Sequence, residues 1–150
     1  MANTFYRLHY HVVFSTKSRQ RFLQGEINER VWPYLGGIAN QWDSKPVQIG
    51  GTDDHVHLLL EIPPKHAPSK VVQAIKGGSS KWVHDTFPEL RTFGWQDGYG
   101  IFSVSKSDVS DVIKYIENQE QHHQTRTFEE EFRMLLERHG IEFDERYLFD

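Results

Sequence analysis

A short stretch, residues 50–62, limits what this chain can fold into more than any other part of it. It reads GGTDDHVHLLLEI and joins a glycine–aspartate turn signal to a run of apolar residues. This composition predicts a β-strand that begins after the turn. Because alternate side chains of a strand lie on one face, His55 and His57 should point the same way while Val56 and Leu58 enter a core.

Two imidazoles on one face of a strand can supply two nitrogen ligands to a divalent metal ion. A His-x-His pair fits equally well with two histidines on a half-exposed face that bind nothing. A metal site therefore needs a third ligand, and a catalytic site needs a reactive group as well. The chain has no cysteine, so these ligands must come from histidine, carboxylate or amide groups.

Hydrophobic periodicity along the chain predicts the order β-α-β-β-α-β. The six elements span residues 6–15, 24–42 and 45–51, the histidine strand, the residues beyond Pro68, and residues 93–105. Gly77 and Gly78 predict an interruption or bend in the second helix. The Asp97-Gly98 pair predicts a hairpin turn within the last of these segments.

Two further helices are predicted after this order. Ser107 is the expected N-cap of a helix that runs to about His123. Thr127 and Glu130 form a capping box for a last helix, which stops at Gly140. We therefore expect the α+β class: a ferredoxin-like antiparallel sheet with helices on one face, plus C-terminal helices. The acidic run at residues 129–131 is expected to be a solvated helix face.

Length, charge and hydropathy narrow the classes of protein. The 150 residues fit one globular domain, and no segment resembles a membrane span or a leader, so we expect a cytoplasmic protein with no membrane partner. The net charge of −4 is uneven, because residues 1–91 hold eleven Lys/Arg against eight Asp/Glu while the remainder holds six against thirteen. Any basic surface therefore belongs to the first part. The cations that could contact phosphate or water are Lys17, Arg19, Arg21, Lys76 and Lys81.

The helix expected after Ser107 carries two stripes of side chains. Its apolar residues, Val109, Val112, Ile113 and Ile116, form one stripe that should face a core. Tyr115 and Gln119 lie on a second, polar stripe and are neighbours at spacing i, i+4. A hydroxyl nucleophile beside an oxygen ligand, brought to the histidine strand, would form a metal-assisted site for attack on a phosphodiester. Taken by themselves, Tyr115 and Gln119 fit an amphipathic surface better than a catalytic site.

In this order and spacing the motifs resemble a known family. The similar segments are YHVVFSTKSRQRF, DDHVHLLLEI, SKVVQAIKGGSSKWVHDTFPEL and DVIKYIENQEQHH, and together they cover nearly the whole chain. They resemble the HUH single-tyrosine transposases, which include the TnpA-type and REP-associated tyrosine transposases of small bacterial insertion sequences. The resemblance matches His55 and His57 to the family's metal-binding pair, Tyr115 to its nucleophile and Gln119 to its third metal ligand.

The resemblance implies metal-dependent cleavage and rejoining of single-stranded DNA through a 5′-phosphotyrosine intermediate. It implies Mg²⁺ or Mn²⁺ as cofactor, hairpin-bearing DNA ends as partner, and a homodimer whose active site is shared between subunits. We expect one HUH transposase domain over residues 1–150, with a catalytic core at 1–124 and an acidic helical tail at 125–150. The acidic tail departs from the basic character of such transposases.

Three alternatives remain open from the sequence. The chain could be a domesticated relative that binds or nicks repeat hairpins without moving an element. It could be a metal-dependent hydrolase that uses His55, His57 and a further ligand such as His122 with a water nucleophile, and then Tyr115 is dispensable. It could also be a non-catalytic ferredoxin-like binding domain. No general base for Tyr115 can be identified in the sequence.

Overall fold

The computed structural model describes residues 3–149. Four antiparallel strands form one sheet in the order β2-β3-β1-β4. The strands are β1 (His9–Ser15), β2 (Lys45–Gly51), β3 (His55–Glu61) and β4 (Gly100–Val104). The α-helices are α1 (Glu26–Gln41), α2 (Pro68–Thr86), α3 (Val109–Glu117), α4 (Gln119–His122) and α5 (Phe128–Arg138). Four short 3-10 helices are η1 (Lys17–Arg19), η2 (Pro88–Leu90), η3 (Lys106–Asp108) and η4 (Glu145–Tyr147).

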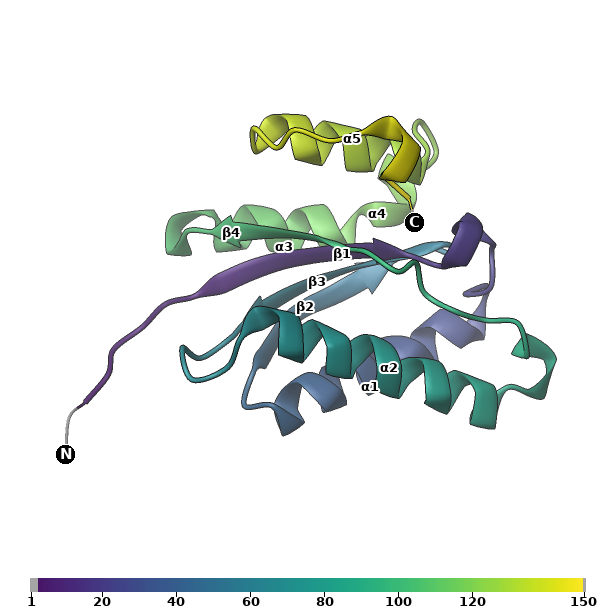
Figure 1. The fold of residues 1–150 in the computed structure, drawn as a ribbon, viewed down its shortest axis with the longest axis horizontal. Coiled ribbons are helices and arrows are strands. Elements are labelled where there is room, and N and C mark those ends of the chain that lie inside the picture. Colours follow the sequence, from purple (N-terminus) through teal and green to yellow (C-terminus); the bar gives the residue numbers. More distant parts are fainter. Residues whose placement is uncertain (1–2, 150) are drawn as a thin grey trace.

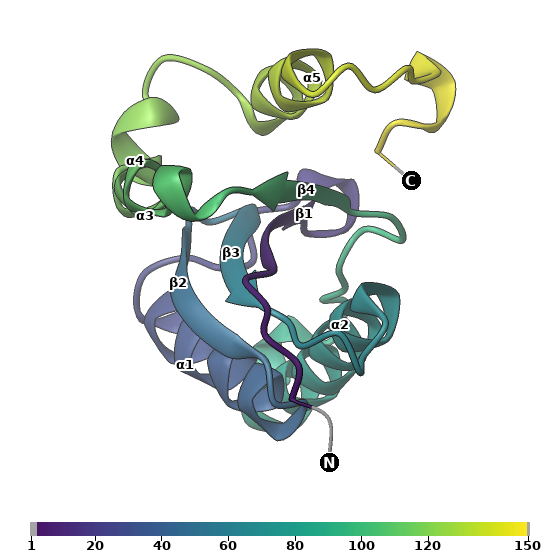
Figure 2. The ribbon, with the colours of Figure 1, turned by 90° about the vertical axis from the view of Figure 1, so that its left-hand side faces the viewer.

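Helices cover both faces of the sheet. Helices α1 and α2 lie against one face, and α3, α4 and α5 lie on the other side (Figures 1 and 2). The strand order and the β-α-β-β-α-β sequence confirm the predicted ferredoxin-like α+β class. None of the helices described between residues 3 and 149 is long and apolar enough to cross a membrane.

The side chains of β3 alternate as its sequence predicts. Val56 and Leu58 belong to the main core, which the sheet forms with α1 and α2. His55, His57 and Leu59 point to the opposite face, where Leu59 packs against α3. The alternative of a half-exposed histidine face is wrong, because both imidazoles have no exposed surface. Burial on this scale follows from the C-terminal helices that cover this side of the sheet.

The helix after β4 differs from its prediction at both ends. Ser107 lies inside η3, and Asp108 takes the N-cap position of α3. The helix then breaks at Asn118, where α3 ends and the single turn of α4 begins with Gln119. The predicted apolar stripe is confirmed, because α3 packs on the sheet through it. The sheet accepts this close packing at Gly50, where a Cβ would lie 3.0 Å from the carbonyl oxygen of Ile116.

The second helix is continuous, so the predicted interruption is wrong. Helix α2 runs unbroken through Gly77 and Gly78. A Cβ at Gly78 would lie 3.0 Å from Cδ1 of Ile38, so this glycine lets α2 approach α1 closely. Glycine costs a helix interior only about 1 kcal/mol relative to alanine, which the packing of the two helices can offset.

The expected Asp97-Gly98 hairpin is also wrong, because these residues lie in a loop before β4, which pairs with β1. The ammonium group of Lys76 stabilises the loop. Its Nζ donates hydrogen bonds to the carbonyl oxygens of Gln96, Asp97 and Gly98 at 2.6, 3.0 and 2.8 Å. Burial lowers the pKa of Lys76 to about 8.

The last helix begins as predicted. The Thr127 hydroxyl accepts a hydrogen bond from the backbone N–H of Glu130, and the Glu130 side chain accepts one from the backbone of Thr127. Helix α5 then packs on the sheet in a second apolar cluster with β1 and β4. The members of this cluster are Val13, Phe102, Phe128, Phe132, Leu135 and Leu136. The expectation of a fully solvated acidic face is wrong, because Glu131 has no exposed surface.

Candidate active site

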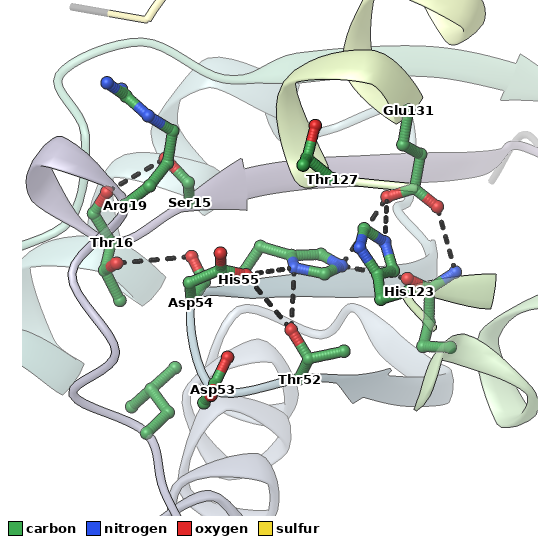
Figure 3. Close-up of polar contacts among 12 residues, drawn as sticks. Ser15, Thr16, Arg19, Thr52, Asp53, Asp54, His55, His123, Thr127 and Glu131 are labelled. Atoms are coloured by element: carbon green, nitrogen blue, oxygen red, sulfur yellow. Dashed lines mark hydrogen bonds and ion pairs between the residues drawn. The ribbon is translucent and has the colours of Figure 1, made fainter. Parts of the chain in front are cut away.

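His55 stands at the start of β3 with both ring nitrogens engaged (Figure 3). Its Nδ1 lies 2.7 Å from a carboxylate oxygen of Asp54 and 3.0 Å from the hydroxyl of Thr52. Burial alone would raise the pKa of Asp54, but the hydrogen bond from His55 holds it below its ordinary value. An ionised carboxylate only accepts, so Nδ1 carries the proton of the ring. In the neutral form of the ring, the lone pair is then at Nε2.

His57 is also held through its Nδ1 atom, by a hydrogen bond to the neighbouring strand β1. Its Nδ1 lies 2.8 Å from Nε2 of His11 on β1. Burial lowers the pKa of His57, and burial together with His57 lowers the pKa of His11 to about 3, so both rings are neutral. When His57 donates from Nδ1 to His11, its Nε2 presents a lone pair on the same side as that of His55. Sequence reasoning placed His11 in a strand and gave it no role.

Gln119 contacts His55 from the start of α4. Its side-chain NH₂ group faces two acceptors, a carboxylate oxygen of Glu131 at 3.2 Å and the carbonyl of Tyr115 at 3.4 Å. Its Oε1 therefore faces Nε2 of His55, at 2.9 Å. An amide oxygen and an imidazole lone pair attract each other only when a cation, either a proton or a metal ion, lies between them.

Tyr115 lies on α3, half-buried, beside the same cluster. Its hydroxyl donates a short hydrogen bond to Glu131. Its ring lies edge-on to His57, with centroids 5.6 Å apart, and stacks on His122 at 4.8 Å. Burial and the neighbouring carboxylate of Glu131 raise the pKa of Tyr115. The phenol is therefore protonated in this arrangement.

Glu131 is, after His11, a second site residue that sequence reasoning missed. Its Oε1 lies 3.0 Å from Nε2 of His57 and 3.0 Å from Nε2 of His123. Burial alone would raise the pKa of Glu131, but its close contacts with the ring nitrogens of His57 and His123 hold it well below its ordinary value. The sequence does carry a signal for it. Residues 128, 131, 132 and 135 share one side of a helix, so Glu131 lies on the apolar stripe of α5.

These side chains fit a divalent metal ion. Ligand atoms of His55, His57 and Glu131 all lie within 4.8 Å of one another, and all three residues are buried. The expected ligand Gln119 brings its amide oxygen to the same point. His122, the further ligand of the hydrolase alternative, instead stacks on Tyr115.

The five cations expected to contact DNA do not share one surface. Lys17 and Arg19 lie in η1, and Arg21 follows shortly after it. A groove lined by Arg19, Arg21 and residues 123–130 opens beside the site. Lys76 and Lys81 belong to α2, which covers the opposite face of the sheet (Figure 2). The ammonium group of Lys76 already bonds three carbonyls, and that of Lys81 pairs with Asp85 at 2.8 Å.

Comparison with known protein families decides the class of this protein. The family model described as "Transposase IS200 like" matches residues 4–119. The chain belongs to this family. It is 34% identical over 119 residues to the ISDra2 transposase TnpA of Deinococcus radiodurans, which covers 76% of this chain and 85% of that protein. It is 32% identical over 123 residues to the transposase for insertion sequence element IS200 of Salmonella typhimurium, which covers 77% of this chain and 80% of that protein.

Solved structures agree with this membership. A crystal structure described as a candidate transposase from Deinococcus radiodurans superposes with a TM-score of 0.67 at 31% identity, over 79% of this chain and 95% of that one. A REP-associated tyrosine transposase bound to a REP hairpin superposes with a TM-score of 0.60 over 82% of this chain and 74% of that one. Its 13% identity shows a common fold only. The predicted family and enzyme class, a DNA transposase, are confirmed.

Proposed function

We propose that this transposase cleaves and rejoins single-stranded DNA through a covalent bond between Tyr115 and a 5′ phosphate. The observation that carries the proposal is the meeting of a phenol with a buried group of metal-ligand atoms. Tyr115 lies on α3 and His57 on β3, yet their rings are in edge-on contact. A nucleophile beside a site for a divalent cation is the arrangement that attack on a phosphodiester requires.

In the proposed reaction, the phenolic oxygen of Tyr115 loses its proton and attacks the scissile phosphorus. The bond from phosphorus to the 3′ oxygen breaks, which leaves a 5′-phosphotyrosine and a free 3′-hydroxyl. A hydroxyl group later attacks the phosphotyrosine, reseals the strand and returns the phenol. The covalent intermediate retains the phosphodiester energy, so no nucleotide cofactor is needed.

We propose Mg²⁺ or Mn²⁺ as the cofactor, with Nε2 of His55, Nε2 of His57 and Oε1 of Gln119 as ligands. The donor set supports this assignment, because the amide oxygen of Gln119 faces an imidazole nitrogen at 2.9 Å. The bonds to Asp54 and His11 orient the two rings toward this point. A bound ion would polarise a non-bridging phosphate oxygen and offset the charge that develops there.

The covalent step can be tested directly. The transposase should form a denaturation-resistant adduct with labelled single-stranded DNA in the presence of MnCl₂, detected as a shifted band in a denaturing gel. A metal-dependent hydrolase with a water nucleophile would release cleaved DNA without an adduct. A non-catalytic binding domain would give neither product, and either of these results would overturn the proposal.

We propose single-stranded DNA that carries a hairpin as the substrate. A similar fold has been solved bound to a REP hairpin, and the groove beside the site carries Arg19 and Arg21. The lining of this groove includes His123, whose Nε2 lies 3.0 Å from Oε1 of Glu131, and the same carboxylate accepts the hydrogen bond of Tyr115. Lys17, on the exposed surface of η1, is a third candidate for a phosphate contact.

Binding should depend on salt in a way that reports this groove. Arg21→Glu should weaken the affinity for DNA by about tenfold and reduce the slope of log affinity against log salt by about 0.7. The reason is that a complex with one fewer phosphate contact releases fewer counterions from the DNA when it forms. Lys81→Glu, the same reversal on α2, should change affinity little. Fluorescence anisotropy of a hairpin oligonucleotide at several salt concentrations measures both. A flat salt response, or equal effects of the two variants, would contradict the groove.

The resemblance to the family implies a homodimer with a shared site, but the contacts described here do not require a partner. Gln119 bonds His55, and Tyr115 contacts His57, within one chain. We therefore propose that each chain holds a complete site, whether or not it dimerises. A mixture of His57→Ala and Tyr115→Phe chains should then form no adduct. Restored adduct formation after demonstrated subunit exchange would place the site between two chains.

A further inference from the structure

Helix α5 brings a carboxylate into the site from outside the family match. The match ends at residue 119, whereas Glu131 lies in the first turn of α5. The helix is fixed at its start by the capping box of Thr127 and along its length by Phe128, Phe132 and Leu135, which pack on the sheet. This docking holds the Glu131 side chain with no exposed surface.

The carboxylate of Glu131 lies beside His55 and His123 (Figure 3), and it also contacts His57. Its Oε1 is 3.0 Å from Nε2 of His57 and 3.5 Å from Nε2 of His55. The orientation of His55, whose Nδ1 is held by Asp54, leaves its Nε2 without a proton in the uncharged ring. An imidazole lone pair and a carboxylate oxygen at this distance repel each other unless a cation lies between them.

The charge of Glu131 is balanced by no permanent cation. Over residues 3–149, the ion-pair partners of its carboxylate are the histidines His55, His57 and His123, with no lysine or arginine among them. A buried carboxylate without a fixed counter-charge is costly. A divalent ion held by two neutral imidazoles and an amide oxygen keeps its full positive charge, because none of these ligands is charged. It therefore lacks a negative partner, just as Glu131 lacks a positive one. Mg²⁺ and Mn²⁺ also prefer oxygen ligands, and carboxylates above all.

We propose that Glu131 is a further ligand of the metal centre, through Oε1, so that α5 completes the site within the chain. The proposal rests on the proposed function for the existence of that centre. The second oxygen, Oε2, accepts the hydrogen bond of Tyr115 and one from the amide of Gln119. One carboxylate thus joins the ion to the nucleophile and makes metal affinity depend on the docking of α5.

The opposite role for the same carboxylate is that it blocks the site, with its oxygens in the place of a DNA phosphate. The two roles predict different changes in metal affinity when the carboxylate is removed. Removal of a ligand weakens metal binding, whereas removal of a blocking anion leaves metal binding unchanged or tightens it and increases cleavage. Metal affinity in the absence of DNA therefore separates them.

The experiment is isothermal titration of the full chain with MnCl₂. Glu131→Gln keeps the shape of the side chain and removes its charge, and it should weaken Mn²⁺ affinity by at least tenfold. Glu130→Gln is the matched control on the neighbouring exposed residue, since glutamine still completes the capping box. It should bind Mn²⁺ like the parent. Equal or tighter Mn²⁺ binding by Glu131→Gln overturns the proposal.

A second variant covers the case in which Glu131→Gln fails to fold. Leu135→Ala weakens the packing of α5 without touching the polar cluster, and it should also lower Mn²⁺ affinity if α5 supplies a ligand. Unchanged affinity, with α5 shown to be loosened by hydrogen exchange, counts against the proposal. The parent chain separates the two proposals. If it binds Mn²⁺ and forms an adduct while Glu131→Gln binds Mn²⁺ equally well, only the ligand role of Glu131 fails.

Discussion

Replacement of Tyr115 by phenylalanine should abolish the protein–DNA adduct and leave the fold intact. The change removes one oxygen, which is the proposed nucleophile, so we expect adduct formation to fall at least about 1000-fold, to the background of the assay. The ring keeps its contacts with His57 and His122. Loss of the hydroxyl's bond to Glu131 should cost about 1–2 kcal/mol of stability, since Gln119 still donates to the same carboxylate oxygen.

Denaturing gels with labelled hairpin DNA and MnCl₂ measure the adduct, and circular dichroism measures the fold. Tyr34→Phe is the matched control, because Tyr34 lies on α1, which covers the opposite face of the sheet from the site. It should form the adduct at the parental rate. A normal adduct from the Tyr115→Phe variant would show that another group is the nucleophile. Normal cleavage without any adduct would move the water-dependent hydrolase ahead.

Local patterns in the sequence were sufficient to predict the framework of the site. The alternation in β3 fixes His55 and His57 on one face, because the side-chain period of a strand does not depend on distant residues. The apolar stripe of α3 likewise fixes which side of that helix meets the sheet. The helix break at Asn118 was not predicted. It moves Gln119 to the start of α4, yet this residue still reaches His55.

The groups that complete the site depend on contacts between distant parts of the chain. His11 and His57 are 46 residues apart, and Glu131 and His57 are 74 apart, so no local spacing joins them. The acidic run of residues 129–131 predicts a solvated helix face for Glu131. Its position on the apolar stripe of α5 indicated burial, but the stripe does not say which surface covers it. That surface is the histidine face of the sheet.

The same reasoning applies to the cations, whose surroundings a charge count does not describe. Lys76 belongs to the part of the sequence with an excess of basic residues. In the fold, however, its ammonium group donates hydrogen bonds to backbone carbonyls of the loop before β4. Arg19 and Arg21 do face a groove beside the site. A charge count does not distinguish a lysine that bonds backbone carbonyls in a loop from an arginine that lines a groove, because the difference lies in which backbone groups the fold leaves unpaired nearby.

Replacement of His57 by alanine should remove divalent-metal binding and, with it, adduct formation. The change deletes one of two imidazole ligands and leaves the buried carboxylate of Glu131 with one fewer partner, so we expect Mn²⁺ affinity to fall at least about 100-fold. His55→Ala should have the same effect, and Gln119→Ala a smaller one, since two nitrogen ligands remain. Isothermal titration with MnCl₂ measures the loss.

His66→Ala, at an exposed ion pair with Asp43, is the control and should bind Mn²⁺ like the parent. If the His57→Ala chain is folded by circular dichroism and still binds Mn²⁺ with parental affinity, the ion is not held by the face of β3, and the cation required between Gln119 and His55 is a proton.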